Sequence, residues 1–235
     1  CTLAEFSPDR FKTHPVTVLA GLKHKLGTDA QVTYVTSPAL PMVDSTSYGT
    51  SRREIPSLAP TSAEISASLE RVKVAAERAD VVVAVMGELA NMSSEHESRA
   101  TLDLPGIQQQ MLEAAVSTGK PVVLVLENGR PLDIRWAARH TQAILEAWYP
   151  GTEGGNAVAD LLFGDVDPGG KLPVSWPRAS GQEPLYYDHN LTQFPEGQPN
   201  SRSRYWDMSS QPLYPFGYGL SYTTFKFTNL KISET

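Results

Sequence analysis

The 235-residue chain contains a single cysteine, Cys1, and no long apolar run. A disulfide needs two thiols, so an internal disulfide is impossible, and a metal site built from several cysteines is excluded as well. A membrane-spanning helix needs roughly 18 or more consecutive apolar residues, and no stretch of the sequence approaches that length. Apolar residues still make up 40% of the chain, which is enough for a sizeable core in one large domain.

Clustered positive charge is also missing. The chain has 20 Lys and Arg against 26 Asp and Glu, a formal net charge of −6, and the short pair Arg52-Arg53 forms no basic patch. Binding to nucleic acid relies on clustered Lys and Arg side chains that contact phosphates, so we expect no nucleic-acid partner. An acidic surface remains compatible with neutral substrates such as sugars.

Several catalytic signatures are absent. There is no Gly-x-Ser-x-Gly elbow for a Ser-His-Asp triad. The histidines are scattered without metal-ligand spacing, so we expect neither a metal nor another cofactor; they are His14, His24, His96, His140 and His189. The glycine-rich stretch 151–156 lacks the Lys-Ser/Thr of a phosphate-binding loop. We therefore favour a tight turn at a helix start over a phosphate cradle.

Apolar runs that alternate with helical periodicity dominate the middle of the chain. The strands predicted here are 81–86, 122–126 and 143–148, and the helices are 61–78, 107–118 and 153–163. Continuous apolar character is typical of strands buried on both faces of a parallel sheet. The sequence therefore predicts an α/β fold, a mostly parallel sheet with helices on both faces (an α/β sandwich). Within it, Val81–Met86 and Val122–Leu126 are predicted as adjacent central strands.

Weaker patterns flank this region. We expect a helix between Pro15 and Gly27, and residues 36–60, with four prolines, should form a long loop. Alternation of apolar and polar residues also predicts strands at 31–35 and 224–232, and a late strand is expected at 171–176.

Ligands of open α/β sheets gather beyond the carboxyl ends of the strands, which here are followed by loops 87–106, 127–135 and 149–155. The first part of loop 87–106, residues 87–99, brings together charged side chains; they are Glu88, Glu95, His96, Glu97 and Arg99. Two interpretations stay open, a catalytic or binding role and a solvated loop whose charges only keep it soluble. Because the loop has little that could anchor it in a core, we expect it to be exposed and mobile when no other domain covers it.

Aromatic side chains cluster near the carboxyl terminus, at Tyr186-Tyr187, Tyr205-Trp206 and Tyr214-Pro215-Phe216. Such side chains can stack on sugar rings, but more often they pin an irregular tail onto a core, which is the interpretation we favour.

Several motifs, in the right order, resemble the carboxy-terminal domain of glycoside hydrolase family three, in particular its bacterial periplasmic β-glucosidase branch. The motifs are VVVAVMGE (81–88), EHESR (95–99) with LDLPG (102–106), GKPVVLVLENGRP (119–131), WYPGTEGGNAVADLLFGD (148–165) with PGGKLP (168–173), and YPFGYGLSY (214–222). The resemblance covers most of residues 15–230.

The resemblance implies retaining hydrolysis of β-glycosides from the non-reducing end. In the family an aspartate of an amino-terminal (β/α)8 barrel is the nucleophile, and a glutamate on a loop of this domain is the general acid/base. The matching position here is Glu95, with Glu97 as the rival. The two carboxyl groups of a retaining enzyme stand about 5–5.5 Å apart. A β-glucosidase is the reading we prefer, with a β-xylosidase or a non-catalytic carbohydrate-binding or scaffolding module as alternatives.

The resemblance also implies a domain organisation. We expect residues 1–223 to form the carboxy-terminal α/β domain without its usual first strand, and 224–235 to begin a fibronectin-like domain or a linker. The implied partners are a β-linked oligosaccharide or glucoside, the barrel and the fibronectin-like domain, with a homodimer also considered. The implied location is periplasmic or secreted. Because the nucleophile belongs to the barrel, we expect the isolated chain to be inactive. Family members commonly carry an acidic residue at the position of Thr101.

Overall fold

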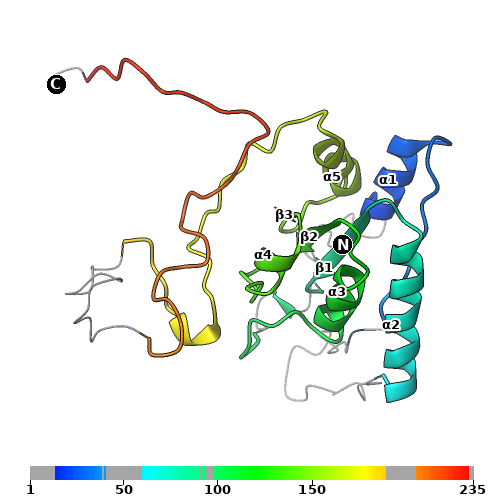
Figure 1. Cartoon of the computed structure of the whole chain (residues 1–235). Coiled ribbons are helices and arrows are strands. Elements are labelled where there is room, and N and C mark those ends of the chain that lie inside the picture. Colours follow the sequence, from blue (N-terminus) through cyan, green and yellow to red (C-terminus); the bar gives the residue numbers. More distant parts are fainter. Residues whose placement is uncertain are drawn as a thin grey trace.

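The computed structural model describes residues 14–38, 40, 60–89, 92–93, 98–188 and 205–232. Its centre is a three-stranded parallel sheet in the order β1-β2-β3 (Figure 1), made of β1 (Val82–Gly87), β2 (Val122–Glu127) and β3 (Ala143–Glu146). The predicted pairing of the first two strands is confirmed, with Ala84 opposite Leu124. The expected central position holds for β2 alone: β1 lies at one end of the described strand order, and its Val85 is 43% exposed.

The apolar sequence of β2 explains its central position. Leu124 and Leu126 point into one core cluster and Val125 into a second, and all three side chains are fully buried. Side chains alternate across a strand, so a strand that buries both sets must be covered on both faces.

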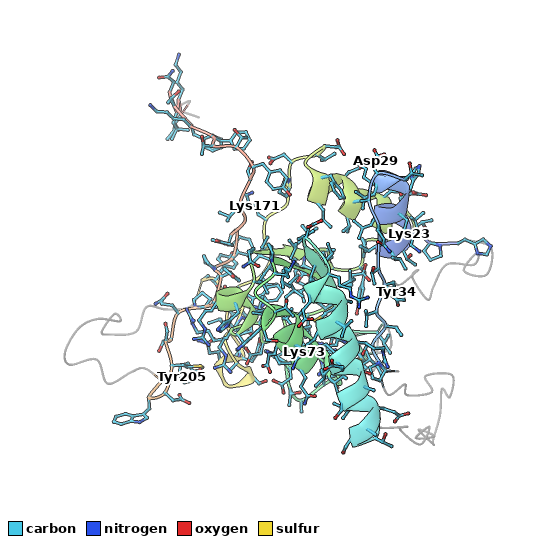
Figure 2. All side chains as sticks on the ribbon, turned by 45° about the vertical axis from the view of Figure 1, so that its right-hand side comes forward. Lys23, Asp29, Tyr34, Lys73, Lys171 and Tyr205 are labelled. Atoms are coloured by element: carbon cyan, nitrogen blue, oxygen red, sulfur yellow. The ribbon has the colours of Figure 1, made fainter. Side chains whose placement is uncertain are left out.

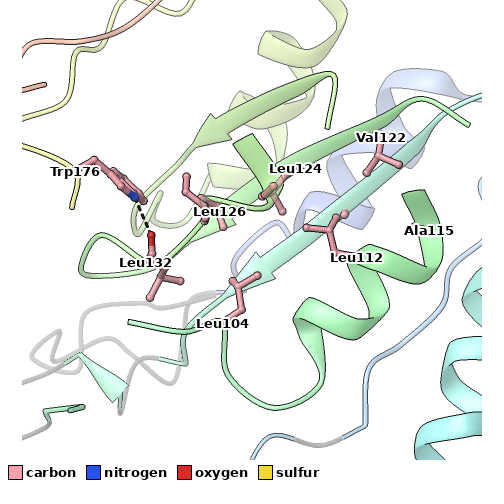
Figure 3. Packing of buried hydrophobic residues seen from close by; sticks show 11 residues of the cluster. Leu104, Leu112, Ala115, Val122, Leu124, Leu126, Leu132 and Trp176 are labelled. Carbon is pink, nitrogen blue, oxygen red and sulfur yellow. Dashed lines mark hydrogen bonds between the residues drawn. The ribbon is translucent and has the colours of Figure 1, made fainter. Parts of the chain in front are cut away.

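Two pairs of helices provide that cover (Figure 1). On one face α3 (Gln108–Val116) packs Leu112 and Ala115 against the Leu124 cluster, as Figure 3 shows, and α2 (Ser62–Glu77) lies beside α3. On the other face α1 (Val18–Leu26) and α5 (Gly154–Phe163) contact each other and supply Val18 and Val158 to the Val125 cluster. The predicted parallel sheet with helices on both faces is confirmed. None of the helices in the described ranges is long and apolar enough to cross a membrane.

The helix ends follow the local sequence. Thr61 caps α2, because its hydroxyl accepts a bond from the Glu64 N–H at 3.3 Å and the Glu64 carboxylate accepts one from the Thr61 N–H at 2.7 Å. α1 ends at Gly27, as its sequence predicts. A single-turn helix, α4 (Ala137–His140), connects β2 to β3.

The described residues after α5 up to the tail, 164–188 and 205–223, lie beside the α/β body and form what we call the carboxy-terminal ribbon. It contains a short 3-10 helix, η2 (Ser180–Gln182). Figure 2 places Tyr205 of this part on the opposite side of the body from Lys73 of α2. The strand expected at 171–176 is wrong: only an isolated antiparallel bridge joins Trp176 to Tyr214. Pro173 and Pro177 lack N–H groups, which limits the ladder that this segment can form.

The strands expected at 31–35 and 224–232 are also wrong, because both segments run without regular structure. Alternation describes a pleated segment, but a strand is stable only beside a hydrogen-bonded partner. In the tail, which runs away from the body in Figure 1, Phe227 is 95% exposed. Residues 41–59 of the expected long loop lie outside the described residues.

Candidate functional site

The loops after the three strands converge at the carboxyl edge of the sheet, as expected. They contribute Glu88 after β1, Arg130 after β2 and Tyr149 after β3. Glu88 is the centre of this site, and its side chain is completely shielded from solvent. A buried carboxyl group needs partners, because burial removes the water that would otherwise solvate it.

The exit of β1 is shaped by Gly87. Its φ of 143° is a conformation that favours glycine, and a Cβ there would lie 1.9 Å from the carbonyl oxygen of Glu127. The side-chain amide of Gln108 accepts a bond from the Gly87 N–H at 2.7 Å and donates one to its carbonyl oxygen at 2.8 Å. The Glu88 N–H then donates to the Glu127 carbonyl at 2.9 Å. The backbone that carries Glu88 is therefore held on both sides.

The Glu88 carboxylate has three partners. Arg99 Nη1 lies 2.8 Å from Oε1, Arg130 Nε lies 3.3 Å away, and the Ser93 hydroxyl donates a hydrogen bond of 2.5 Å to Oε2. Bonds between charged groups are shorter and stronger than neutral ones, and burial strengthens them further. We call Glu88, Ser93, Arg99 and Arg130 the Glu88 cluster.

The described flanks of loop 87–106 are packed at some residues and exposed at others. Glu88 is 5% exposed, and Leu104 is buried at 6% as part of the main core. The expectation that the loop lacks apolar anchors is therefore wrong, because Leu104 is such an anchor, while the expected exposure holds at Ser98, Ala100, Thr101 and Asp103. The candidate acid/base Glu95 and its rival Glu97, with His96, lie outside the described residues.

Gly129 allows the loops to approach each other closely. A Cβ at this position would lie 2.6 Å from the Cβ of Ser93 and 2.8 Å from Cε2 of Tyr149. Burial raises the pKa of the Tyr149 hydroxyl above its usual range, and the Glu88 carboxylate acts in the same direction. Residues at 93, 129 and 149 therefore form one continuous surface, although nothing in the sequence singles out Gly129.

A second carboxyl group lies at the end of β3. Burial raises the pKa of Glu146 to about 8, although the Trp148 N–H and the Asn128 amide, which both donate to it, act in the opposite direction. Asn128 is fully buried, its Nδ2 donates to the Arg130 carbonyl at 2.8 Å, and its Oδ1 has no hydrogen-bond partner among the described residues. Sequence reasoning missed this pair; the signal was a carboxylate and an amide at the ends of two apolar strands.

The glycine-rich turn serves helix packing. The Gly155 N–H donates to the carbonyl oxygen of Val16 at 3.0 Å, and a Cβ on Gly155 would lie 2.1 Å from the carbonyl oxygen of Thr17. Its N–H is therefore not free for a phosphate, which supports the tight-turn interpretation. Within the described ranges, no group of three or more His, Cys, Asp or Glu side chains is placed to hold a metal ion.

The aromatic side chains divide into two groups. Trp176 and Tyr214 join the ribbon to itself, and Trp176 is buried in the main core. Tyr187 and Phe216 stack with ring centroids 4.7 Å apart and help to line a hollow of about 280 Å³. Of the aromatic residues expected to pin the tail, only Tyr214 packs against the main core, whereas Tyr187, Tyr205, Trp206 and Phe216 are exposed. The expectation therefore holds for Tyr214 alone.

Comparison with known proteins agrees with this architecture. Residues 5–222 match the family model of the glycosyl hydrolase family 3 C-terminal domain. A periplasmic β-glucosidase of Salmonella typhimurium is 45% identical over 226 residues, which cover 93% of this chain and 29% of that protein. A β-xylosidase of Formosa agariphila is 46% identical over 161 residues, 68% of this chain and 22% of that protein. The crystal structure of a β-glucosidase from Listeria innocua superposes with a TM-score of 0.65 at 44% identity, covering 68% of this chain and 23% of that one.

The chain thus spans less than a third of the length of these relatives, which contain further domains. The matched residues, however, cover nearly all of this chain, and the solved relative shares its fold as well as its sequence. The chain belongs to the glycosyl hydrolase family 3 C-terminal domain family.

Proposed function

We propose that this chain is the acid/base domain of a retaining, exo-acting β-glucosidase that removes terminal non-reducing β-D-glucosyl residues. The observation that carries the proposal is the anchored, carboxylate-bearing loop at the carboxyl edge of the sheet, in a chain that is 45% identical to a protein named as a periplasmic β-glucosidase. The proposed partners are a β-linked glucoside or oligosaccharide and an amino-terminal barrel that supplies the nucleophile. The name of the Salmonella relative supports a periplasmic location.

Glu95 is the proposed general acid/base and Glu97 its rival. In the first step Glu95 protonates the leaving oxygen while the barrel carboxylate attacks the anomeric carbon and forms a covalent glycosyl intermediate. In the second step Glu95 takes a proton from water, which attacks the same carbon and releases the sugar and the free nucleophile. The carboxyl groups would have to stand about 5–5.5 Å apart.

An acid catalyst must hold its proton before the first step, and a free cation beside it would favour loss of that proton. Arg99 is the nearest arginine in the sequence. Its Nη1 contacts Glu88 at 2.8 Å and its Nη2 donates to the carbonyl oxygen of Asp103 at 2.7 Å. The guanidinium of Arg99 therefore already has a carboxylate partner in Glu88.

Residues 1–223 are the proposed extent of the domain, and 224–235 would begin a fibronectin-like domain or a linker. A β-xylosidase is the second candidate function, because the Formosa agariphila β-xylosidase is 46% identical over 161 residues. The sugar-binding residues of the family belong mainly to the barrel, so the two activities differ outside this chain.

The test compares Glu95→Gln with Glu97→Gln in the intact enzyme. Glu95→Gln should lower kcat/KM for an alkyl β-glucoside by about 10²–10⁴, the usual contribution of general acid catalysis. For 2,4-dinitrophenyl β-glucoside the first step needs little protonation, so kcat/KM should change far less. Repeating the assay with β-xylosides identifies the preferred sugar. If Glu97→Gln alone shows this dependence, the acid/base is Glu97, and if neither variant does, the domain is not the source of the acid.

A further inference from the structure

Glu95 belongs to the segment 94–98. Glu88 contacts the residue just before this segment and the residue just after it. On the amino-terminal side it accepts the hydrogen bond of Ser93 at 2.5 Å, and on the carboxy-terminal side it pairs with Arg99 at 2.8 Å. One buried carboxylate therefore joins the two described residues that bracket residues 94–98.

The two arginines extend this connection to the backbone. Arg130 donates from Nη2 to the carbonyl oxygen of Met92, just before the segment, and Arg99 donates from Nη2 to that of Asp103, just after it. Arg130 belongs to the loop after β2, whereas Glu88 directly follows β1. The ends of the segment are thus tied to two neighbouring strands at once.

Solvent is kept away from the centre of this arrangement. The Glu88 side chain has no exposed surface, while those of Arg99 and Arg130 are only 19% and 21% exposed. Water competes poorly for such bonds, and removing the carboxylate would deprive both guanidinium groups of the Glu88 counter-charge. Glu88 is therefore the member of the cluster that contacts all three of the others.

We propose that Glu88 is a positioning residue for the general acid/base: it holds both ends of the segment so that the Glu95 carboxyl meets the leaving oxygen. This inference rests on the proposed function. Glu88 itself touches no substrate, and its effect is exerted through the placement of Glu95. A displacement of about 1 Å in a catalytic group can cost on the order of 10² in rate, so a loosened segment should weaken protonation in particular.

The experiment measures kcat/KM against leaving-group pKa in the intact enzyme, for Glu88→Gln and for Asp133→Asn. Asp133 is a matched control, because its carboxylate also pairs with an arginine, Arg135, at 2.6 Å, but it contacts neither Ser93 nor Arg99. Glu88→Gln should lower kcat/KM for an alkyl β-glucoside by about 10–100-fold and leave 2,4-dinitrophenyl β-glucoside within a few-fold of wild type. Asp133→Asn should show no dependence on the leaving group.

Two further variants separate positioning from general loss of structure. Ser93→Ala removes the hydroxyl that bonds to Glu88 and Arg130 but removes no charge. It should therefore fold even if Glu88→Gln does not, and it should show a smaller dependence of the same kind. In a Glu95→Gln background, Glu88→Gln should cause no further loss with the alkyl glucoside, because the group it positions is already gone.

An equal loss for all leaving groups, or a multiplicative loss in the double variant, would overturn the positioning role while leaving the proposed function intact. A flat response of both Glu95→Gln and Glu97→Gln would instead remove the proposed function, and the positioning role with it. The same outcomes read from Ser93→Ala decide the question if Glu88→Gln yields no folded protein.

Discussion

The indole N–H of Trp176 donates a hydrogen bond of 2.8 Å to the carbonyl oxygen of Leu132 (Figure 3). Trp176 is 1% exposed and Leu132 is completely buried, so neither group can turn to water instead. Trp176 lies in the carboxy-terminal ribbon, and Leu132 lies between β2 and α4. This bond therefore fastens the ribbon to the α/β body at the edge of the main core.

Trp176→Phe should lower the free energy of unfolding by about 1–3 kcal/mol, because it leaves the Leu132 carbonyl buried without a donor. Trp176→Ala also removes most of the ring and should cost about 3–5 kcal/mol. Urea denaturation followed by circular dichroism gives both values. The control is Trp206→Phe at a fully exposed position, where the change should stay within about 0.5 kcal/mol. Equal effects at the two tryptophans would contradict the assigned role of Trp176.

Gly21→Ala should destabilise the contact between α1 and α5. A Cβ at position 21 would lie 2.0 Å from the carbonyl oxygen of Gly155, so the two helices must move apart to accept the methyl group. Overpacking of this kind costs about 1–3 kcal/mol. Gly169→Ala is the control, because no atom lies within 4 Å of a Cβ there. Thermal melting of both variants checks the prediction, and a Gly21→Ala protein as stable as wild type would refute the close contact.

The buried carboxyl of Glu146 should make stability depend on pH. Its folded pKa of about 8 is higher than the usual glutamate value of 4.5, so between these limits the folded state binds a proton that the unfolded state has released. This contribution to stability is complete below pH 4.5 and is lost as pH rises towards 8, at no more than about 1.4 kcal/mol per pH unit.

Glu146→Gln keeps the shape of the group and removes its titration. The variant should gain stability relative to wild type as pH rises from 5 towards about 8, and the difference should level off above that. The control is Glu77→Gln at an exposed position of α2, where solvent screens the charge. Denaturation at a series of pH values measures all three proteins. A wild-type curve parallel to that of Glu146→Gln would show that the carboxyl titrates normally.

Local patterns predicted the α/β body because each pattern there agrees with its tertiary surroundings. The apolar run of β2 is buried on both faces, and the capping box at Thr61 marks the start of α2. The segments 171–176 and 224–232 carry an equally plausible strand pattern but have no ladder partner that completes a strand. Strand formation depends on a second segment far away in the sequence, and alternation alone does not identify that segment.

The candidate site was predictable in its position but not in its contacts. Parallel strands bring their carboxyl ends to one edge, so the loops with Glu88 and Arg130 had to meet. The choice of partners depends on three-dimensional packing: Arg99 pairs with Glu88, and Gly129 makes room for Ser93 and Tyr149. Neither set of contacts can be predicted from the spacing of these residues in the sequence.

The 235-residue chain by itself should show no detectable glycosidase activity. Covalent catalysis needs a carboxylate on the face of the sugar opposite the acid, and under the proposed function that residue belongs to the barrel. The purified chain should therefore fail to hydrolyse p-nitrophenyl β-glucoside and β-xyloside, while the intact enzyme cleaves one of them. Far-ultraviolet circular dichroism of the chain provides the control that the inactive sample is folded.

Turnover by a sample of the isolated chain would contradict this prediction only if the chain itself, and not a contaminating hydrolase, catalyses it. A variant with Glu95→Gln, prepared in parallel, separates this case from a contaminating hydrolase, because a contaminant would be unaffected by the substitution. Turnover that the substitution abolishes would mean that both carboxyl groups lie within these 235 residues. The nucleophile would then have to be sought among the carboxylates around the Glu88 cluster, and the division of labour between barrel and α/β domain would be wrong for this protein.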